Sequence, residues 1–225
     1  METSLHRQLK SFYAGDDAPF EVPLGDFRID VVSGGELIEI QHGSLAALRS
    51  KVGRLLEHHR VRIVKPIIAR KVLVRQDARG GRVLSRRHSP KRGTMLDLFD
   101  ELVYFRHLFP HARLTLEVIL VDVEEWRYPG HGRRRRYREN DFEIEDQRLS
   151  TVHETFSLRT AADLRKLLRV KLPATFHTGH LADALGIKRF VAQKIAYCLR
   201  HCGAADQIGK QGNAALYKFR KRSAA

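Results

Sequence analysis

Two carboxylic acids and one amide lie close together in residues 27–41, FRIDVVSGGELIEIQ, and together they could bind a metal ion. The three side chains are Asp30, Glu39 and Gln41. Apolar and polar residues alternate on both sides of Gly34-Gly35, a preferred two-residue turn between antiparallel strands. We therefore predict a β-hairpin with Asp30 on one arm and with Glu39 and Gln41 on the other.

The register of this hairpin would bring the two acids together. If the glycines form the turn, Val31 lies opposite Ile38 and Asp30 lies opposite Glu39. Directly opposed residues have Cβ atoms roughly 5 Å apart, and like charges in that position destabilise a sheet. A divalent cation would remove the repulsion, because Mg²⁺ binds one or two carboxylates together with waters and phosphate oxygens. The pattern predicts part of a metal site, with Glu21 as a further candidate ligand.

An acid, a short turn and then Glu-x-Lys across a hairpin form the signature of the PD-(D/E)XK, or restriction-endonuclease-like, nucleases. Residues 30–41 resemble it, with Gln41 in the position of the usual lysine, and this Glu-x-Gln form is similar to CoiA-like nucleases. The resemblance implies an α+β fold with an αβββαβ core. It also implies Mg²⁺- or Mn²⁺-dependent hydrolysis of DNA phosphodiesters by Asp30, Glu39 and Gln41. Gln41 can only hydrogen-bond, whereas lysine would also supply positive charge.

Hydrophobic periodicity predicts the elements around this hairpin. A short amphipathic helix covers 5–14, where Lys10 could add a further ligand, and a longer helix covers 44–59. The remaining elements predicted for the first half are strands at 21–23, 27–32, 61–68, 71–75 and 114–123, a connection rich in Gly and Arg at 76–94, and a helix at 95–109. We expect a nuclease-like domain at 1–125 and a basic β-hairpin insert at 126–157.

The last segment, 158–225, is similar to the winged-helix superfamily. Thr160 and Asp163 form a capping-box pattern that opens a helix, and helices at 177–185 and 187–202 precede two short strands around Gln211-Gly212-Asn213. In the second of these helices we expect Phe190, Val191, Ile195, Cys198, Leu199 and Cys202 to face the core. Arg189, Gln193, Ala196 and Arg200 would face outward, where arginine and glutamine suit phosphates or base edges.

Charge makes a nucleic acid the expected partner. The net charge is +15, and residues 171–225 carry 10 Lys/Arg against 2 Asp/Glu, whereas residues 1–58 carry 6 against 9. A polyanion is the natural partner of such a basic chain. DNA is favoured and RNA stays open. The candidate nucleic-acid-binding residues are Arg133, Arg134, Arg135, Arg136, Arg138, Lys188, Arg189, Gln193, Arg200 and Lys210.

Other functions are less well matched by the pattern. His177, His180, Cys198 and Cys202 superficially offer zinc ligands, but the cysteines belong to an apolar helical stripe and suggest reduced core thiols. The amino terminus shows no signal-peptide pattern, so we expect a cytoplasmic protein without membrane association. A homodimer stays open. The alternatives to a nuclease are a non-catalytic DNA-binding protein on an inactive nuclease-like scaffold, and a protein-docking winged helix.

Overall fold

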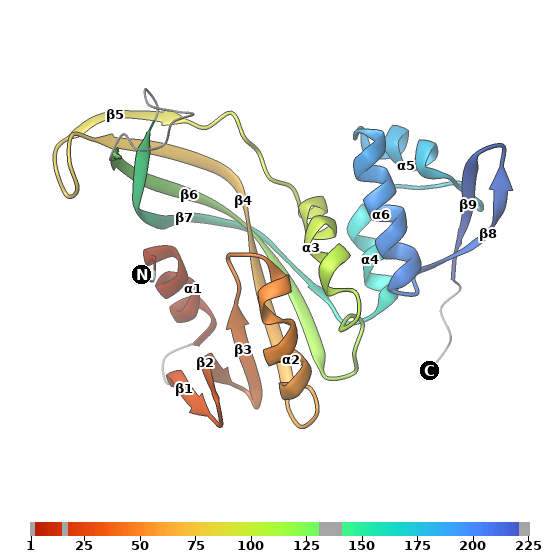
Figure 1. Ribbon diagram of the computed structural model, residues 1–225, viewed down its shortest axis with the longest axis horizontal. Coiled ribbons are helices and arrows are strands. Elements are labelled where there is room, and N and C mark those ends of the chain that lie inside the picture. Colours follow the sequence, from red (N-terminus) through yellow and green to blue (C-terminus); the bar gives the residue numbers. More distant parts are fainter. Residues whose placement is uncertain (1–2, 15–17, 131–140, 221–225) are drawn as a thin grey trace. The chain divides into compact units, whose positions relative to one another are not determined.

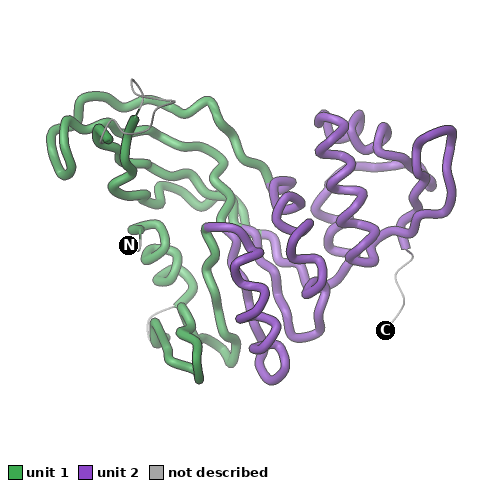
Figure 2. Tube along the Cα trace, viewed as in Figure 1, with its two compact units in different colours: residues 1–42, 66–94, 119–155 green, residues 43–65, 95–118, 156–225 purple. Residues whose placement is uncertain are grey.

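The computed structural model describes residues 3–14, 18–130 and 141–220, which form a mixed α/β structure with one large sheet and several helices. The chain divides into two compact units, each built from three separate segments (Figure 2). The first unit contains residues 1–42, 66–94 and 119–155, and the second contains residues 43–65, 95–118 and 156–225. No helix in the described ranges is long and apolar enough to cross a membrane.

The first elements follow the predicted order of helix, three strands, helix and strand (Figure 1). They are α1 (Ser4–Ala14), β1 (Phe20–Leu24), β2 (Phe27–Ser33), β3 (Glu36–Ile40), η1 (Leu45–Leu48), α2 (Arg49–Leu55) and β4 (Arg60–Gln76). The helix predicted for 44–59 begins as the short 3-10 turn η1, in which the Ala47 N–H donates to the Ser44 carbonyl at 3.2 Å and the Ser44 hydroxyl accepts the Ala46 N–H at 3.3 Å. Its apolar stripe is nevertheless buried as expected, since Leu45, Val52 and Leu55 are at most 4% exposed.

The hairpin between β2 and β3 has the predicted register. Ser33 pairs with Glu36 and Val31 pairs with Ile38, so the Gly-Gly turn is confirmed. Both turn glycines have positive φ, 57° for Gly34 and 75° for Gly35. A two-residue turn with two positive φ values matches the twist of the strands, and glycine adopts it without strain.

Two of the strands that follow, β4 and β6 (Leu114–Pro129), are longer than predicted. The other two are β5 (Val83–His88) and β7 (Phe142–Leu158), and the helix before β6 comprises η2 (Met95–Asp97) and α3 (Leu98–Phe105). Within the described residues the sheet has seven strands in the order β1-β2-β3-β4-β6-β7, with β5 antiparallel to β4. The prediction of a plain connection at 76–94 is wrong, because residues 83–88 pair along β4 although all six are exposed. A strand without a buried face leaves no apolar periodicity in the sequence.

The segment predicted as a basic insert, 126–157, contains the end of β6 and nearly all of β7. These two strands are neighbours in the main sheet, and β6 begins at Leu114, before the predicted limit. The arginine-rich turn itself, including Arg133, Arg134, Arg135, Arg136 and Arg138, lies outside the described residues.

The carboxy-terminal segment contains three helices followed by a hairpin. These elements are α4 (Ala161–Leu168), α5 (Thr178–Leu185), α6 (Arg189–His201), β8 (Ala205–Gln211) and β9 (Ala214–Phe219). Phe176, just before α5, forms an isolated antiparallel bridge with Tyr217 of β9. The ring of Phe176 is fully buried and lies 4.7 Å from that of Phe219, which ties the hairpin to the helices.

The buried stripe of α6 differs from the predicted one. Ala192, Ile195, Ala196 and Leu199 are at most 1% exposed, and their i, i+3, i+4, i+7 spacing defines the core face. Phe190 lies off this stripe and is 54% exposed, so its predicted core position is wrong. Ala196 is buried rather than outward, because the small alanines let α6 pack closely on its own neighbours. Cys198 and Cys202 are buried free thiols, as predicted.

A capping box begins α4, as the sequence predicts. Asp163 accepts hydrogen bonds from the Thr160 N–H at 2.9 Å, from the Arg159 N–H at 3.1 Å and from the Lys166 ammonium at 2.7 Å. Burial raises the pKa of the Asp163 carboxyl, but these donors outweigh that effect and lower its pKa from 3.8 to about 2. The ionised carboxylate is therefore part of the folded structure.

We expect Asp163→Ala to lower the free energy of unfolding by about 1 kcal/mol at neutral pH, the usual effect of losing a helix cap. Since folding depresses the pKa of Asp163, its contribution is present above the unfolded value of 3.8 and is lost as the pH falls toward 2. Urea unfolding over this pH range should show the two proteins converging in acid. Asp183→Ala, at an exposed acid of α5, is the control, and a pH-independent deficit for Asp163→Ala would contradict the prediction.

Candidate functional site

Three carboxylates lie in a row across β1, β2 and β3. On one side, Phe20 pairs with Val31 and Val22 with Ile29, which places Glu21 opposite Asp30. On the other side, the hairpin pairing ends at Val31–Ile38, and the next position in that register sets Asp30 opposite Glu39. Opposed residues of neighbouring antiparallel strands share a face of the sheet. The predicted Asp30–Glu39 pair thus becomes a row of three acids with Asp30 in the middle.

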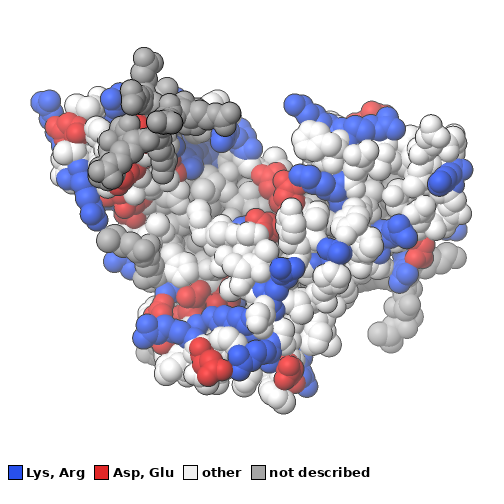
Figure 3. Space-filling model, in the orientation of Figure 1, with Lys and Arg blue, Asp and Glu red and all other residues white. Residues whose placement is uncertain are grey.

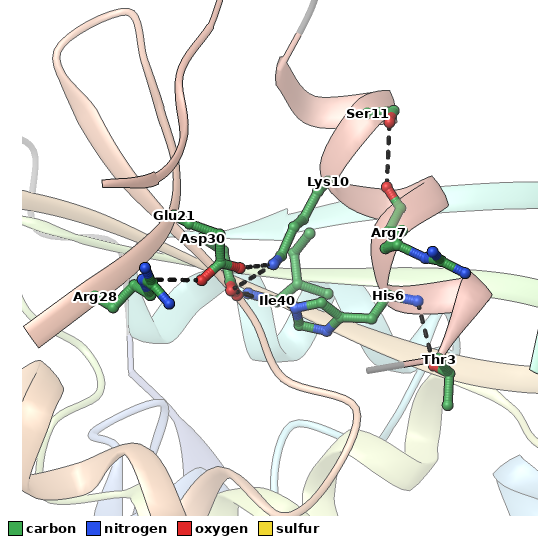
Figure 4. Close-up of polar contacts among 9 residues, drawn as sticks. All are labelled: Thr3, His6, Arg7, Lys10, Ser11, Glu21, Arg28, Asp30 and Ile40. Carbon is green, nitrogen blue, oxygen red and sulfur yellow. Dashed lines mark hydrogen bonds and ion pairs between the residues drawn. The ribbon is translucent and has the colours of Figure 1, made fainter. Parts of the chain in front are cut away.

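Helix α1 packs on β2 and β3 and supplies two cationic or ionisable groups to this row (Figure 4). The Lys10 ammonium hydrogen-bonds to the Glu21 carboxylate and lies 3.5 Å from Asp30 Oδ1. The imidazole Nε2 of His6 lies 3.2 Å from the same oxygen. Lys10 is only 5% exposed, so this charge sits at the buried interface between α1 and the sheet.

The second oxygen of Asp30 contacts the backbone of the hairpin. Asp30 Oδ2 accepts the Ile40 N–H at 2.8 Å, at the point where the β2–β3 pairing ends. Burial raises the pKa of Asp30, but the hydrogen bond with His6, the Ile40 N–H and the charge of Lys10 outweigh it, so the pKa lies below 3.8. Asp30 is therefore held as a carboxylate, oriented from both sides.

Glu21 occupies an unusual backbone conformation. Its φ is +53°, although it is not glycine and belongs to a strand. The left-handed region costs an ordinary residue of order 1 kcal/mol or more, and such residues concentrate at functional sites. In this conformation the Glu21 carboxylate accepts a hydrogen bond from the Lys10 ammonium, and its Oε2 lies 3.4 Å from Nε of Arg28. The surrounding contacts compensate the strain and fix the carboxylate beside Asp30.

Side chains of the protein itself, and not only a metal ion, offset the repulsion expected at Asp30. Lys10 and His6 lie against Asp30, and Lys10 and Arg28 lie against Glu21. A sequence pattern within the hairpin could not show this, because the charges come from α1. From the first helix the sequence pattern predicts only a further metal ligand, Lys10, and it gives His6 no role. Its spacing of four from Lys10 puts both on one helix face, which is the signal that was available.

The carboxylate oxygens still fit a hard divalent cation. Asp30 Oδ2 accepts one hydrogen bond and keeps a second lone pair, and Glu39 is a carboxylate only 4% exposed beside it in the row. Among the described residues no three His, Cys, Asp or Glu side chains form a complete metal cage. Mg²⁺ does not require one, since it usually keeps several waters and takes one or two carboxylates.

The remaining predicted residues occupy different places. Gln41 follows the last residue of β3 and is half-buried. Lys188, Arg189, Gln193 and Arg200 are exposed on α6 or at its start, and Lys210 is exposed on β8. In Figure 3, basic side chains outnumber acidic ones on the visible surface of these carboxy-terminal elements. His177 caps α5 through Nδ1, which accepts the Gly179 N–H at 3.0 Å.

Comparison with known proteins places the chain in a family. Residues 3–159 match the family model described as "Domain of unknown function (DUF8091)". A protein of Treponema pallidum (strain Nichols), described as an uncharacterized protein, is 30% identical over 219 residues, which cover 96% of this chain and 85% of that relative. No solved structure matches. The chain therefore belongs to the DUF8091 family, whose matched region contains the whole carboxylate row.

Replacing Lys10 should destabilise the protein, because the carboxylate row would lose its buried cation. In Lys10→Met, Glu21 and Asp30 lose their shared cation while remaining partly buried, so the free energy of unfolding should fall by about 3 kcal/mol at neutral pH. Because Asp30 has a depressed folded pKa, the ion pair acts above 3.8 and fades in acid, so the deficit should shrink as the pH falls. Urea unfolding at several pH values measures this deficit.

Arg7→Met is the matched control, since Arg7 lies on the same helix but is exposed. We expect it to change stability by less than about 0.5 kcal/mol. If Lys10→Met were no more destabilising than this control, the buried ion pair would not be what holds α1 on the sheet.

Proposed function

We propose that this protein is a metal-dependent nuclease that hydrolyses phosphodiester bonds of DNA. The observation that carries the proposal is the row of Glu21, Asp30 and Glu39 with a buried lysine beside it. Asp30 and Glu39 would hold Mg²⁺ or Mn²⁺, with Glu21 as a further candidate ligand. The resemblance of the hairpin to PD-(D/E)XK nucleases supports the proposal, as does the order α1-β1-β2-β3-α2-β4, which is the order of the αβββαβ core of that fold.

Lys10 would supply the positive charge that Gln41 lacks. A nuclease must stabilise the negative charge that develops on the phosphate, and a fixed ammonium does this in a site of low polarity. Lys10 is buried and aimed at Asp30, so it provides a cation close to the carboxylates from a different element. The amide of Gln41 can then orient water or a phosphate oxygen by hydrogen bonding.

The other groups of the site hold charges and protons in place. The Ile40 N–H and His6 fix the Asp30 carboxylate, and His6 is also a residue type that can accept or donate a proton near it. A bound Mg²⁺ or Mn²⁺ would polarise the scissile phosphate and lower the pKa of an attacking water.

DNA would be held chiefly by the carboxy-terminal elements. The order of α4, the Phe176 bridge, α5, α6 and the β8–β9 hairpin supports a likeness to the winged helix, and we propose α6 as the recognition helix. Arg189, Gln193 and Arg200 are exposed along one side of α6. They are 4 and 7 residues apart, which is the spacing of one helical face. Arginine and glutamine there suit phosphates and base edges.

A specific observation favours a second candidate function. Asp30 and Glu21 already have Lys10, His6 and Arg28 as partners, so these two carboxylates do not require a metal to offset their charge. A scaffold that binds DNA without cutting it would look the same. Divalent-ion binding separates the two: the nuclease requires it, and the scaffold does not.

The predicted role of Asp30 in metal binding can be tested with two matched variants in the β1–β2 hairpin. We expect purified protein to nick plasmid DNA with Mn²⁺, and Asp30→Asn to lower the rate roughly a hundredfold or more, the size of effect expected on removing one charged group of an active site. The Mn²⁺-dependent rise in melting temperature should disappear with it. Asp26→Asn, at an exposed acid of the β1–β2 turn, should behave like wild type.

Variants at position 41 refine the result. Gln41→Lys should retain or increase the cleavage rate, and Gln41→Ala should lower it. If Mn²⁺ stabilises wild type and Asp30→Asn equally and neither cleaves DNA, the scaffold function replaces the nuclease.

The role of α6 is tested by salt. Each lost phosphate contact should reduce the slope of log affinity against log salt by about 0.9 on duplex DNA. We expect the double variant Arg189→Ala, Gln193→Ala to weaken binding and flatten this slope in fluorescence anisotropy titrations. Arg60→Ala removes an exposed arginine of β4 and should leave affinity unchanged. Unaltered affinity and slope in the double variant would instead identify these elements as a protein-docking module.

A further inference from the structure

A basic hollow of about 550 Å³ lies in the second compact unit, and its lining does not include Arg189, Gln193 or Arg200 of α6. We define it by its charged lining residues, Arg165, Lys166, Arg169, Lys171 and Arg220. The uncharged lining consists of Ala162, Val170 and Ala204. Its volume lies within the roughly 300–1,000 Å³ of ligand clefts, but the described lining residues include five cations and no acid. A hollow of this composition suits an anion.

Local structure explains how these cations come together. Ala162, Arg165, Lys166 and Arg169 are spaced by 3, 4 and 7 residues along α4 and its end, so they share one helical face. Arg220 follows β9 and reaches the same place, because its N–H donates to the Ala204 carbonyl at 3.0 Å. The cations thus come from two elements that are distant in sequence.

Two of these cations are paired with acids near the hollow. Lys166 pairs with Asp163 at 2.7 Å, and Arg220 pairs with Asp206 at 2.7 Å. The guanidinium of Arg165 lies 4.7 Å from the ring centre of Phe219, a contact that positions it without neutralising it. Among the described residues, the hollow is lined by cations without an acid, so its concave surface is positively charged.

The backbone conformation of Arg169 is independent evidence that the hollow has a function. Arg169 ends α4 with φ +54° and ψ 25°, the left-handed conformation in which helices usually place glycine. Arginine there is strained, and strained residues persist mainly where they serve a function. The helix dipole favours cations near a helix C-terminus. That effect alone does not explain why an arginine occupies the left-handed position or why Arg220 joins the cluster.

We propose that the basic hollow binds a phosphate group of the nucleic-acid backbone, as a second contact besides α6. Arginine and lysine are the side chains that hold phosphate, and arginine can do so through two parallel hydrogen bonds. The inference rests on the proposed nucleic-acid binding but not on cleavage. A small phosphate-bearing ligand would use the same chemistry, and the experiment below distinguishes the two sources.

Arg169→Gly gives a test in which stability and binding move in opposite directions. Glycine relieves the left-handed strain, so the melting temperature should hold or rise. Affinity for a labelled DNA duplex, measured by anisotropy in EDTA so that no cleavage occurs, should fall about tenfold, as expected for losing a hydrogen bond between charged groups. The slope of log affinity against log salt should fall by about 0.9. Inorganic tripolyphosphate, titrated by calorimetry, serves as the small-ligand probe.

Lys171→Ala is a second variant at an exposed lysine of the hollow, and Arg60→Ala is the control outside it. Loss of DNA affinity in the two hollow variants, with or without loss of tripolyphosphate affinity, identifies the backbone phosphate as the ligand. Loss of tripolyphosphate affinity alone identifies a small phosphate compound. Unchanged affinity for both ligands in both hollow variants overturns the proposal, whatever the result of the cleavage assay.

Discussion

The buried ammonium of Lys10 constrains the whole amino-terminal part of the molecule. On α1, Leu5 and Leu9 are fully buried beside it, so the apolar contact that holds the helix on the sheet also removes Lys10 from water. Burying an unpaired charge costs far more than an apolar contact gains. Glu21 and Asp30 must therefore lie beside the Lys10 ammonium. The carboxylate row and the docking of α1 are one interaction seen from two sides.

Acidic and basic residues are divided between different regions of the chain, as the proposed function requires. Residues 1–58 carry an excess of acid, as a site for a divalent cation would, whereas residues 171–225 carry 10 Lys/Arg against 2 Asp/Glu. Acids crowded near DNA would repel it, so a nuclease needs cations elsewhere to hold the backbone. On α6 and in the basic hollow those cations are exposed, in contrast to the buried Lys10.

Among the described residues, Glu21 and Arg169 are the non-glycine residues with positive φ, and each lies at one of the proposed sites. Glu21 strains its strand to place a carboxylate against Lys10, and Arg169 strains the end of α4 to keep a guanidinium in the basic hollow. Glycine would relieve either position but would bring no charge. In both cases the backbone energy is offset by the surrounding structure, and the retained side chain is charged.

Local sequence determined the features that depend on neighbouring residues. The alternation around Gly34-Gly35 specified the hairpin and its register, and the capping pattern specified the start of α4, because turns and caps are settled within a few residues. Contacts between segments that are distant in the chain could not be predicted from local sequence. Only the tertiary structure showed that Lys10 neutralises Asp30 and that β5 pairs along β4. It also decided which side of α6 is buried, leaving Phe190 outside, because burial depends on what packs against a helix and not on its residues alone.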